Sequence, residues 1–240
     1  MKWTDAGGGD FEQPPAGTHV ARCIKMIDIG TQRGEYQGKA NSKRQVIIGF
    51  ELPLELLTEG DAAGKPFTVS RFYTASLSEK ANLRKDLANW RGRDFTQQEL
   101  LGFDSKNILD KGCMLSLTPN DKGKVRITGI MSLPKGSALP PRVNPLVYLS
   151  LEPGEFDQAT FDGLSDGIKK FIVASPEYAS IKNPAAGGAP KGHFDDMEDD
   201  IPFLFNDSLS NVMIPVSASN RRANRARKGM QSVWADKSAF

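Results

Sequence analysis

The sequence has few cysteines, no long apolar run and almost no net charge. Only Cys23 and Cys113 occur among 240 residues, too few for a disulfide scaffold, so a hydrophobic core must hold the fold and both thiols are expected to be reduced. No apolar run approaches the ~18 to 20 residues of a membrane-spanning helix, which excludes such a span. Residues 1–15 carry three acids and three consecutive glycines instead of the apolar stretch of a secretory signal. We therefore expect a cytoplasmic protein.

Motifs of common catalytic chemistry are also missing. The chain has neither a phosphate-binding G-x-x-x-x-G-K-[ST] motif nor a G-x-S-x-G nucleophile motif. His19 and Cys23 would lie ~13 Å apart in an expected strand, at about 3.3 Å per residue, too far to share one zinc ion. The acidic pairs at 195–196 and 199–200 lie on an expected disordered tether without a preorganised metal cage. We therefore expect no catalytic residue, no metal and no cofactor.

The net charge of +2 conceals a strong segregation of charge along the chain. Residues 191–211 hold one cation and six acids, a balance of −5, and residues 212–240 hold six cations and one acid, a balance of +5. Two further segments are positive: residues 15–48, with six cations and two acids, and residues 65–93, with seven cations and two acids. Positive segments of this kind are candidate binding surfaces for an acidic partner.

The apolar pattern predicts a mainly β protein. Strands are expected over residues 18–29, 43–52, 67–74, 113–117 and 125–129, with a flexible hairpin loop over 30–42 and a turn over 119–123. Three strands, a helical insertion and two more strands make the order of a five-stranded OB-fold barrel with a helix between strands 3 and 4. A ferredoxin-like or other small α+β domain is the alternative.

Two capping signals predict the helical insertion. The first is S-x-x-E at residues 76–79, followed by apolar residues at helical spacing up to Trp90 and by Gly92 as terminator. The second is T-x-x-E at residues 96–99, which predicts a short helix ending near Gly102. Because Trp90 lies on the apolar stripe of the first helix, we expect it in the core.

The C-terminal third is expected to pack on the barrel and then become disordered. The proline-rich residues 134–145 predict an extended connector, 146–151 a strand and 155–174 a mainly helical piece. Beyond them, 183–192 (NPAAGGAPKG) has too little apolar surface to fold. The expected organisation is a flexible N-terminus over 1–16, an OB-fold domain with a C-terminal strand and helix extension over 17–181, and a disordered linker and tail over 182–240.

Cations and aromatic residues alternate over residues 33–50 and 67–73. A protein that holds single-stranded DNA without sequence preference needs a basic groove and exposed rings, each stacked base contributing ~1 to 3 kcal/mol. The expected helix after residue 76 adds three cations, two of them four residues apart on one face. The alternative is that Phe50, Phe67 and Phe72 belong to the core and that the cations form an ordinary solvated face. The expected DNA-binding residues are Arg33, Tyr36, Lys39, Lys43, Arg44, Arg71, Phe72, Tyr73, Lys80, Arg84 and Lys85.

The tail contains an acidic segment with a short apolar end, HFDDMEDDIPF at residues 193–203. The acids would steer the segment toward a basic patch, Pro202 stiffens its end, and Ile201 and Phe203 supply a small apolar anchor. An acidic solvating tail with a chance ending is the alternative. The expected partner-binding residues are Asp195, Asp196, Asp199, Asp200, Ile201, Pro202 and Phe203.

These stretches carry two resemblances. DDMEDDIPF, behind its Gly/Pro-rich linker, resembles the acidic tip of bacterial single-stranded DNA-binding proteins. Residues 17–178 are similar to bacteriophage-encoded single-stranded DNA-binding proteins with a divergent OB-fold, in AGTHVARCIKMIDIGTQ, SLSEKANLRKDLANWRGRDFT and PPRVNPLVYLSLE. The resemblance implies a non-catalytic protein that coats unpaired DNA in phage replication, recombination or repair, in the bacterial host cytoplasm, and recruits replication or recombination proteins of phage or host through its tail.

One departure from the bacterial pattern matters. There the final Phe is the chain terminus and its carboxylate is part of what partners bind, whereas here residues 204–240 follow Phe203. Recognition of a terminal carboxylate therefore does not carry over to Phe203. Two other functions compete with DNA coating: a nucleic-acid enzyme or its subunit, such as a nuclease whose acidic residues hold Mg²⁺, and an adaptor whose barrel binds only protein.

Overall fold

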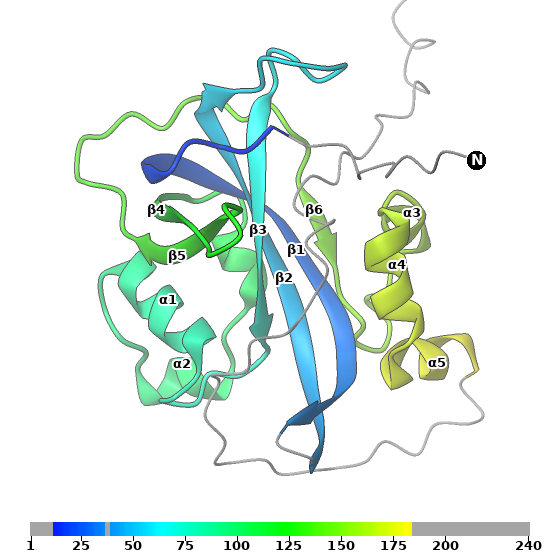
Figure 1. The fold of residues 1–240 in the computed structure, drawn as a ribbon. Helices are drawn as coiled ribbons and strands as arrows, with labels where there is room; N and C mark the ends of the chain where they lie inside the picture. The colour runs from blue at the N-terminus through cyan, green and yellow to red at the C-terminus, as the bar shows by residue number, and fades with distance from the viewer. Residues whose placement is uncertain (1–11, 37–38, 184–240) are drawn as a thin grey trace, which may run out of the picture.

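The computed structural model describes residues 12–36 and 39–183, which form one six-stranded sheet with short helices on both of its faces (Figure 1). Residues 184–240, with most of the expected linker and tail and all seven expected partner-binding residues, lie outside the described residues, as does most of the expected N-terminal segment. Lys182, where the linker was expected to begin, is the last residue of a helix. The mainly β class predicted from the sequence is confirmed. The strands are β1 (Gly17–Tyr36), β2 (Lys39–Leu56), β3 (Pro66–Thr74), β4 (Gly112–Pro119), β5 (Val125–Met131) and β6 (Val147–Leu149).

The strands pair in the order β3-β2-β1-β4-β5, all antiparallel, and β6 pairs with β1 in parallel. All five strands predicted before residue 130, and the one predicted over 146–151, are present. The turn predicted over 119–123 is closed by a hydrogen bond from the Gly123 amide to the Asn120 carbonyl (2.8 Å). Beyond the turn the strand pairing has one irregularity. Leu117 pairs with Ile127 but Ser116 pairs with Gly129, so a β-bulge lies next to Gly129.

The first two strands are much longer than predicted. Pairing continues from Gly30 opposite Gln45 to Tyr36 opposite Lys39, so most of the loop predicted over 30–42 is an antiparallel ribbon instead. The polar residues of this ribbon bury little, which is why hydrophobic alternation does not reveal it. Two register shifts in β1, between Cys23 and Lys25 and between Asp28 and Gly30, explain the imperfect alternation of its apolar residues.

The first helix begins later than its sequence signal predicts. Helix α1 runs over Asn82–Arg91 with Ala81 at its N-cap and no side-chain cap, so the S-x-x-E motif at 76–79 is not a capping box. The Ser76 hydroxyl instead accepts a hydrogen bond from the Ser78 amide (3.2 Å), which stabilises a turn ahead of the helix. The second signal is confirmed, because Thr96 and Glu99 form a reciprocal capping box at the start of α2 (Gln97–Leu101). A short 3₁₀ helix, η1 (Ser105–Ile108), then leads to β4.

The first core cluster lies between the sheet and α1. Trp90 and Leu87 of α1 pack against strand residues such as Phe50, and the Trp90 indole N–H donates to the Gly112 carbonyl (2.8 Å). The prediction that Trp90 is a core residue is confirmed. Both cysteines also belong to this cluster, and burial raises the pKa of Cys23 to about 12.

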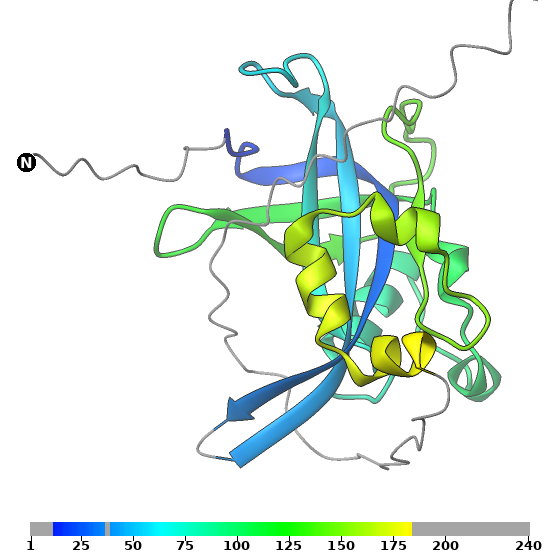
Figure 2. The ribbon, with the colours of Figure 1, turned by 90° about the vertical axis from the view of Figure 1, so that its right-hand side faces the viewer.

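The second core cluster lies on the opposite face of the sheet, under the C-terminal helices (Figure 2). The piece predicted as mainly helical over 155–174 is divided into α3 (Gln158–Asp162) and α4 (Asp166–Val173), and α5 (Pro176–Lys182) follows. Asp157, Ser165 and Ser175 cap their N-termini, which explains why one apolar stripe spans several short helices. The strand residues beneath them are Ile27, Ile29, Ile47 and Leu149. None of the helices in the described part of the chain is long and apolar enough to cross a bilayer.

Candidate nucleic-acid interface

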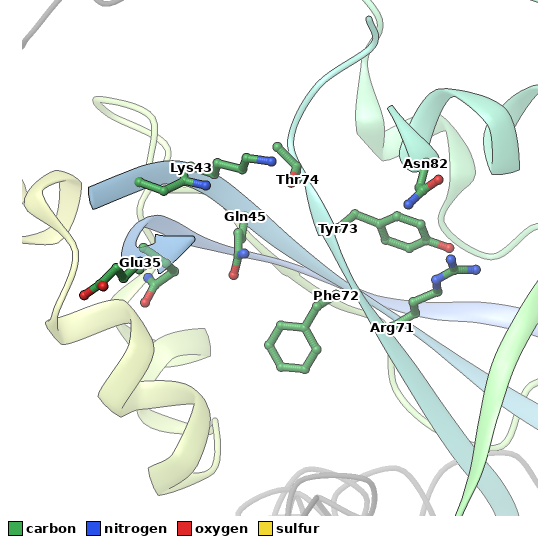
Figure 3. A pocket seen from close by; sticks show the side chains of 11 residues that line it. Glu35, Lys43, Gln45, Arg71, Phe72, Tyr73, Thr74 and Asn82 are labelled. Carbon is green, nitrogen blue, oxygen red and sulfur yellow. The ribbon is translucent and has the colours of Figure 1, made fainter. Parts of the chain in front are cut away.

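A pocket of about 140 Å³ lies where the β1–β2 ribbon meets the end of β3 and the start of α1 (Figure 3). Four of its side chains are carboxamides, two are cations and two are aromatic rings. Its lining consists of Gln32, Gly34, Glu35, Asn41, Lys43, Gln45, Arg71, Phe72, Tyr73, Thr74 and Asn82.

Strand register brings these side chains together from distant parts of the sequence. Gln32 of β1 is opposite Lys43 of β2, and Gln45 of β2 is opposite Thr74 of β3. Because side chains two residues apart in a strand point to the same face, the pocket includes Phe72 as well as Thr74 from one face of β3. That face also carries the second core cluster, against which Phe72 packs.

The pocket extends around β3 to the opposite face of the sheet. Figure 3 shows Phe72 and Gln45 on one side of the strands, whereas Arg71 and Tyr73 point toward Asn82 at the start of α1. Arg71 Nη1 lies 2.9 Å from Asp86 Oδ2, in an ion pair whose alignment falls short of a hydrogen bond. Two buried polar atoms of pocket-lining residues, Arg71 Nη1 and Gln45 Oε1, have no hydrogen-bond partner in the described part of the protein.

Of the eleven expected DNA-binding residues, four line this pocket: Lys43, Arg71, Phe72 and Tyr73. Tyr73 was expected as an exposed stacking ring, but it is buried. Its side chain is only 4 % exposed, belongs to the first core cluster and donates a hydrogen bond to Asp86 (2.8 Å). Burial raises its pKa well above the ordinary value. A base cannot stack on a ring held inside the core, so Tyr73 contributes to the wall of the pocket rather than to a stacking surface.

Three other expected residues belong to the β1–β2 ribbon. Arg33 is exposed and pairs across the ribbon with Ser42, so it points away from the face that carries Lys43. The backbone places Tyr36 at the end of β1 and Lys39 at the start of β2, beside the pocket at the tip of the ribbon. The backbone of the ribbon therefore places these two residues beyond the pocket and Arg33 on its opposite face.

Arg44 lies outside the pocket, in an ion network on the other face of the ribbon. It forms ion pairs with Asp28 and with Glu152 (2.7 Å). Burial alone would lower its pKa, but its bonds to the two carboxylates outweigh burial and raise it. Arg44 also lines a second cavity, of about 460 Å³, between η1, α1 and the residues around β6. Because two carboxylates already neutralise it, Arg44 stabilises this junction and offers little charge to a phosphate.

The three cations near α1 are not arranged as expected. Lys80 precedes the helix, so it does not share a helical face with Arg84. Arg84 is paired with Asp94 (3.0 Å). Lys80 and Lys85 are exposed. This group therefore does not extend the pocket as one continuous basic surface.

The four carboxamide residues of the pocket were missed by the sequence reasoning. Gln32, Asn41, Gln45 and Asn82 carry no charge and no ring, so a search for cations and aromatic residues passes over them. Every second residue from 39 to 45 is a cation or an amide, and this alternation is the signal that could have located the ribbon face.

No cluster of three or more His, Cys, Asp or Glu residues suited to a metal ion occurs in residues 12–36 and 39–183. Comparison with known proteins gives no relative: no protein-family model and no curated protein matches this sequence. A function for the chain has therefore to be inferred from the site itself.

Proposed function

We propose that this chain is a single-stranded DNA-binding protein that coats unpaired DNA without sequence preference during phage replication, recombination or repair. One observation carries the proposal: a single pocket on the sheet gathers Lys43, Arg71 and Phe72 with four carboxamide side chains. Cations for phosphates, a ring for bases and amides for base edges are the three kinds of group that such a protein requires.

Each kind of group has a defined task in this proposal. Lys43 would neutralise a phosphate and release its counterions. The Arg71 guanidinium, which already pairs with Asp86, would add hydrogen bonds to a phosphate. Half-buried Phe72 would stack on a base beside its edge-on partner Phe171, whose ring centroid is 6.0 Å away. The unpartnered Gln45 Oε1 would accept a hydrogen bond from a base edge. Because amide side chains offer both donors and acceptors, four of them can adapt to any base.

The strand arrangement supports assigning the sheet to a divergent OB-fold. The pairing order β3-β2-β1-β4-β5, the approach of β5 to β3 and a helix between β3 and β4 are features of that barrel. OB-folds commonly bind oligonucleotides on the strand 2 and 3 face, and the pocket lies on β2 and β3. Partner recruitment through residues 195–203 is the second half of the proposal and is supported by the sequence alone.

Fluorescence anisotropy with a labelled oligo-dT strand tests the proposal. Binding is expected, and log affinity should fall with log salt at a slope of about −0.7 per phosphate engaged. Lys43→Ala should weaken binding and make the slope less steep by about 0.7. Lys65→Ala is the matched control, because Lys65 is exposed and precedes β3 at the end away from the pocket. No binding in dilute buffer, or an equal effect of both variants, would contradict the proposal.

The same oligonucleotide separates the competing functions. If the chain is a nuclease, the labelled strand will be shortened on incubation with Mg²⁺, and a DNA-coating protein will leave it intact. If the chain is an adaptor for protein only, the anisotropy will not change with protein at any salt concentration.

A further inference from the structure

The Lys25 side chain is enclosed in the sheet but has no partner of opposite charge. It is 8 % exposed, and burial lowers its pKa. Within the described residues its ammonium group takes part in no hydrogen bond or ion pair. Nor is it among the four buried polar atoms that lack a partner, so the group still reaches solvent. An ammonium group that is enclosed, unpaired and still reachable by solvent is an unusual arrangement, because buried lysines are normally paired.

Gly49 makes room for this side chain. Lys25 is directly opposite Gly49 in the β1–β2 pairing. A Cβ atom added to Gly49 would lie 2.9 Å from Lys25 Cβ, 3.4 Å from Lys25 Cδ and 3.2 Å from Ser70 Oγ. The lysine stem therefore lies across the glycine, with the Ser70 hydroxyl beside the same position. Any other residue at position 49 would fill this notch.

The notch lies on the same face of β3 as part of the candidate pocket. Ser70 precedes Phe72 by two residues in unbroken register, so both point to one face, about 6.6 Å apart along the strand. Ser70 is exposed, and Phe72 is half-buried. Thr74, Phe72 and Ser70 thus follow one another on one face of β3, from the pocket to the notch, beside the C-terminal helices.

The carboxylate on this face of β2 does not neutralise the lysine. Glu51 follows Gly49 by two residues and is fully buried. It accepts hydrogen bonds from the Val143 amide and from the amide and side chain of Asn144, the last two at 2.9 and 3.0 Å. Its acceptor capacity is thus directed to the connector before β6.

We infer that Lys25, Gly49 and Ser70 form a second phosphate-binding site, which holds the backbone of the same DNA strand whose neighbouring nucleotide occupies the pocket at Phe72. This inference rests on the proposed function. The ammonium group supplies the charge, the Ser70 hydroxyl supplies a hydrogen bond, and the glycine keeps the stem extended along the sheet. A phosphate diester is favoured over a carboxylate ligand because the site lies next to Phe72 on the same face of β3 and offers one cation and one hydroxyl rather than a bidentate pair.

Oligo-dT titrations of the full chain over a salt series test the site. Lys25→Met, which keeps the length of the stem, should weaken binding about tenfold and make the log–log salt slope less steep by about 0.7. Lys25→Arg should retain the wild-type slope, and Gly49→Ala should weaken binding although it leaves the charge unchanged. Lys170→Met is the matched control, because Lys170 is exposed on α4, and it should change neither quantity.

A wild-type salt slope for Lys25→Met would overturn the inference while leaving the proposed function intact, whereas absence of wild-type binding would overturn the proposed function itself. If Lys25→Met does not fold, the wild-type protein supplies a second test. Acetic anhydride should acetylate the Lys25 amine with release of acetate, and bound oligo-dT should protect Lys25 but not Lys170. Equal reactivity of Lys25 with and without DNA, or no reactivity in either state, would overturn the inference.

Discussion

Glu177 on α5 accepts two hydrogen bonds from Thr31 on β1, one from the backbone amide (2.8 Å) and one from the hydroxyl. The two residues are far apart in sequence, and their contact fastens the last helix to the strand that enters the β1–β2 ribbon. This contact positions the C-terminal helices beside the candidate pocket.

Glu177→Gln should destabilise the protein by about 1 to 2 kcal/mol, because a neutral amide is a weaker acceptor and presents only one oxygen to the two donors. Urea unfolding measures this change, and Glu155→Gln, at an exposed loop position, is the comparison. Equal stability of Glu177→Gln and the wild type would show that the contact is dispensable.

The same carboxylate should make stability depend on pH. Burial raises the pKa of Glu177, but the two hydrogen bonds from Thr31 outweigh burial, and the pKa is lowered from 4.5 in total. A group with a depressed folded-state pKa stabilises the fold above its unfolded pKa, and this contribution is lost as the pH falls through the folded-state value. The stability difference between the wild type and Glu177→Gln should therefore be full at neutral pH and decrease below about pH 4.5.

Gly30→Ala should destabilise the protein by more than the strain of a positive φ alone would. Gly30 has φ +72°, and an added Cβ would lie 2.5 Å from Ser175 Cβ and 2.7 Å from a Glu177 carboxylate oxygen. Gly92 has nearly the same φ, +70°, with open space around it, so Gly92→Ala measures the backbone strain by itself, about 1 kcal/mol. Thermal unfolding should show a clearly larger loss of stability for Gly30→Ala than for Gly92→Ala. Equal losses would mean that α5 moves away from the added Cβ without destabilising the protein.

Tyr73→Phe and Phe72→Leu should separate the two rings of the pocket. Tyr73→Phe removes the hydrogen bond to Asp86 and should cost about 1 kcal/mol of stability with DNA affinity unchanged. Phe72→Leu retains an apolar contact with Phe171 but removes the ring, and should weaken oligo-dT binding by about 1 kcal/mol or more. The opposite pattern in anisotropy titrations would show that the Tyr73 hydroxyl, and not the Phe72 ring, contributes to DNA binding.

Deletion of residues 195–240 tests the tail. The deletion removes six cations and seven anions, and the acidic segment carries charge opposite to that of the DNA-binding surface. Oligo-dT binding should become tighter or stay unchanged, while recruitment of protein partners is lost. Strongly weakened DNA binding would instead assign a DNA contact to the cations between residues 221 and 228.

The sequence predicted the elements whose side chains enter a core. The strand over 67–74, the Thr96 capping box and the core position of Trp90 all follow from local periodicity and are present in the structure. The S-x-x-E signal at 76–79 failed because a serine hydroxyl stabilises a turn as readily as a helix start. The polar ribbon after Gly30 was predicted as a loop because it buries too little surface to leave a hydrophobic pattern.

What the sequence determined by itself was the mainly β class, the order of strands and helices and the two positive segments, because periodicity and charge are local properties of the chain. Only the tertiary structure decided which cations remain available. Carboxylates from distant segments neutralise Arg44 and Arg84, whereas no carboxylate pairs with Lys25 in the described part of the chain. Pairing between strands, which no local pattern reveals, determines which of these charged side chains meet and brings Lys43 and Phe72 into one pocket.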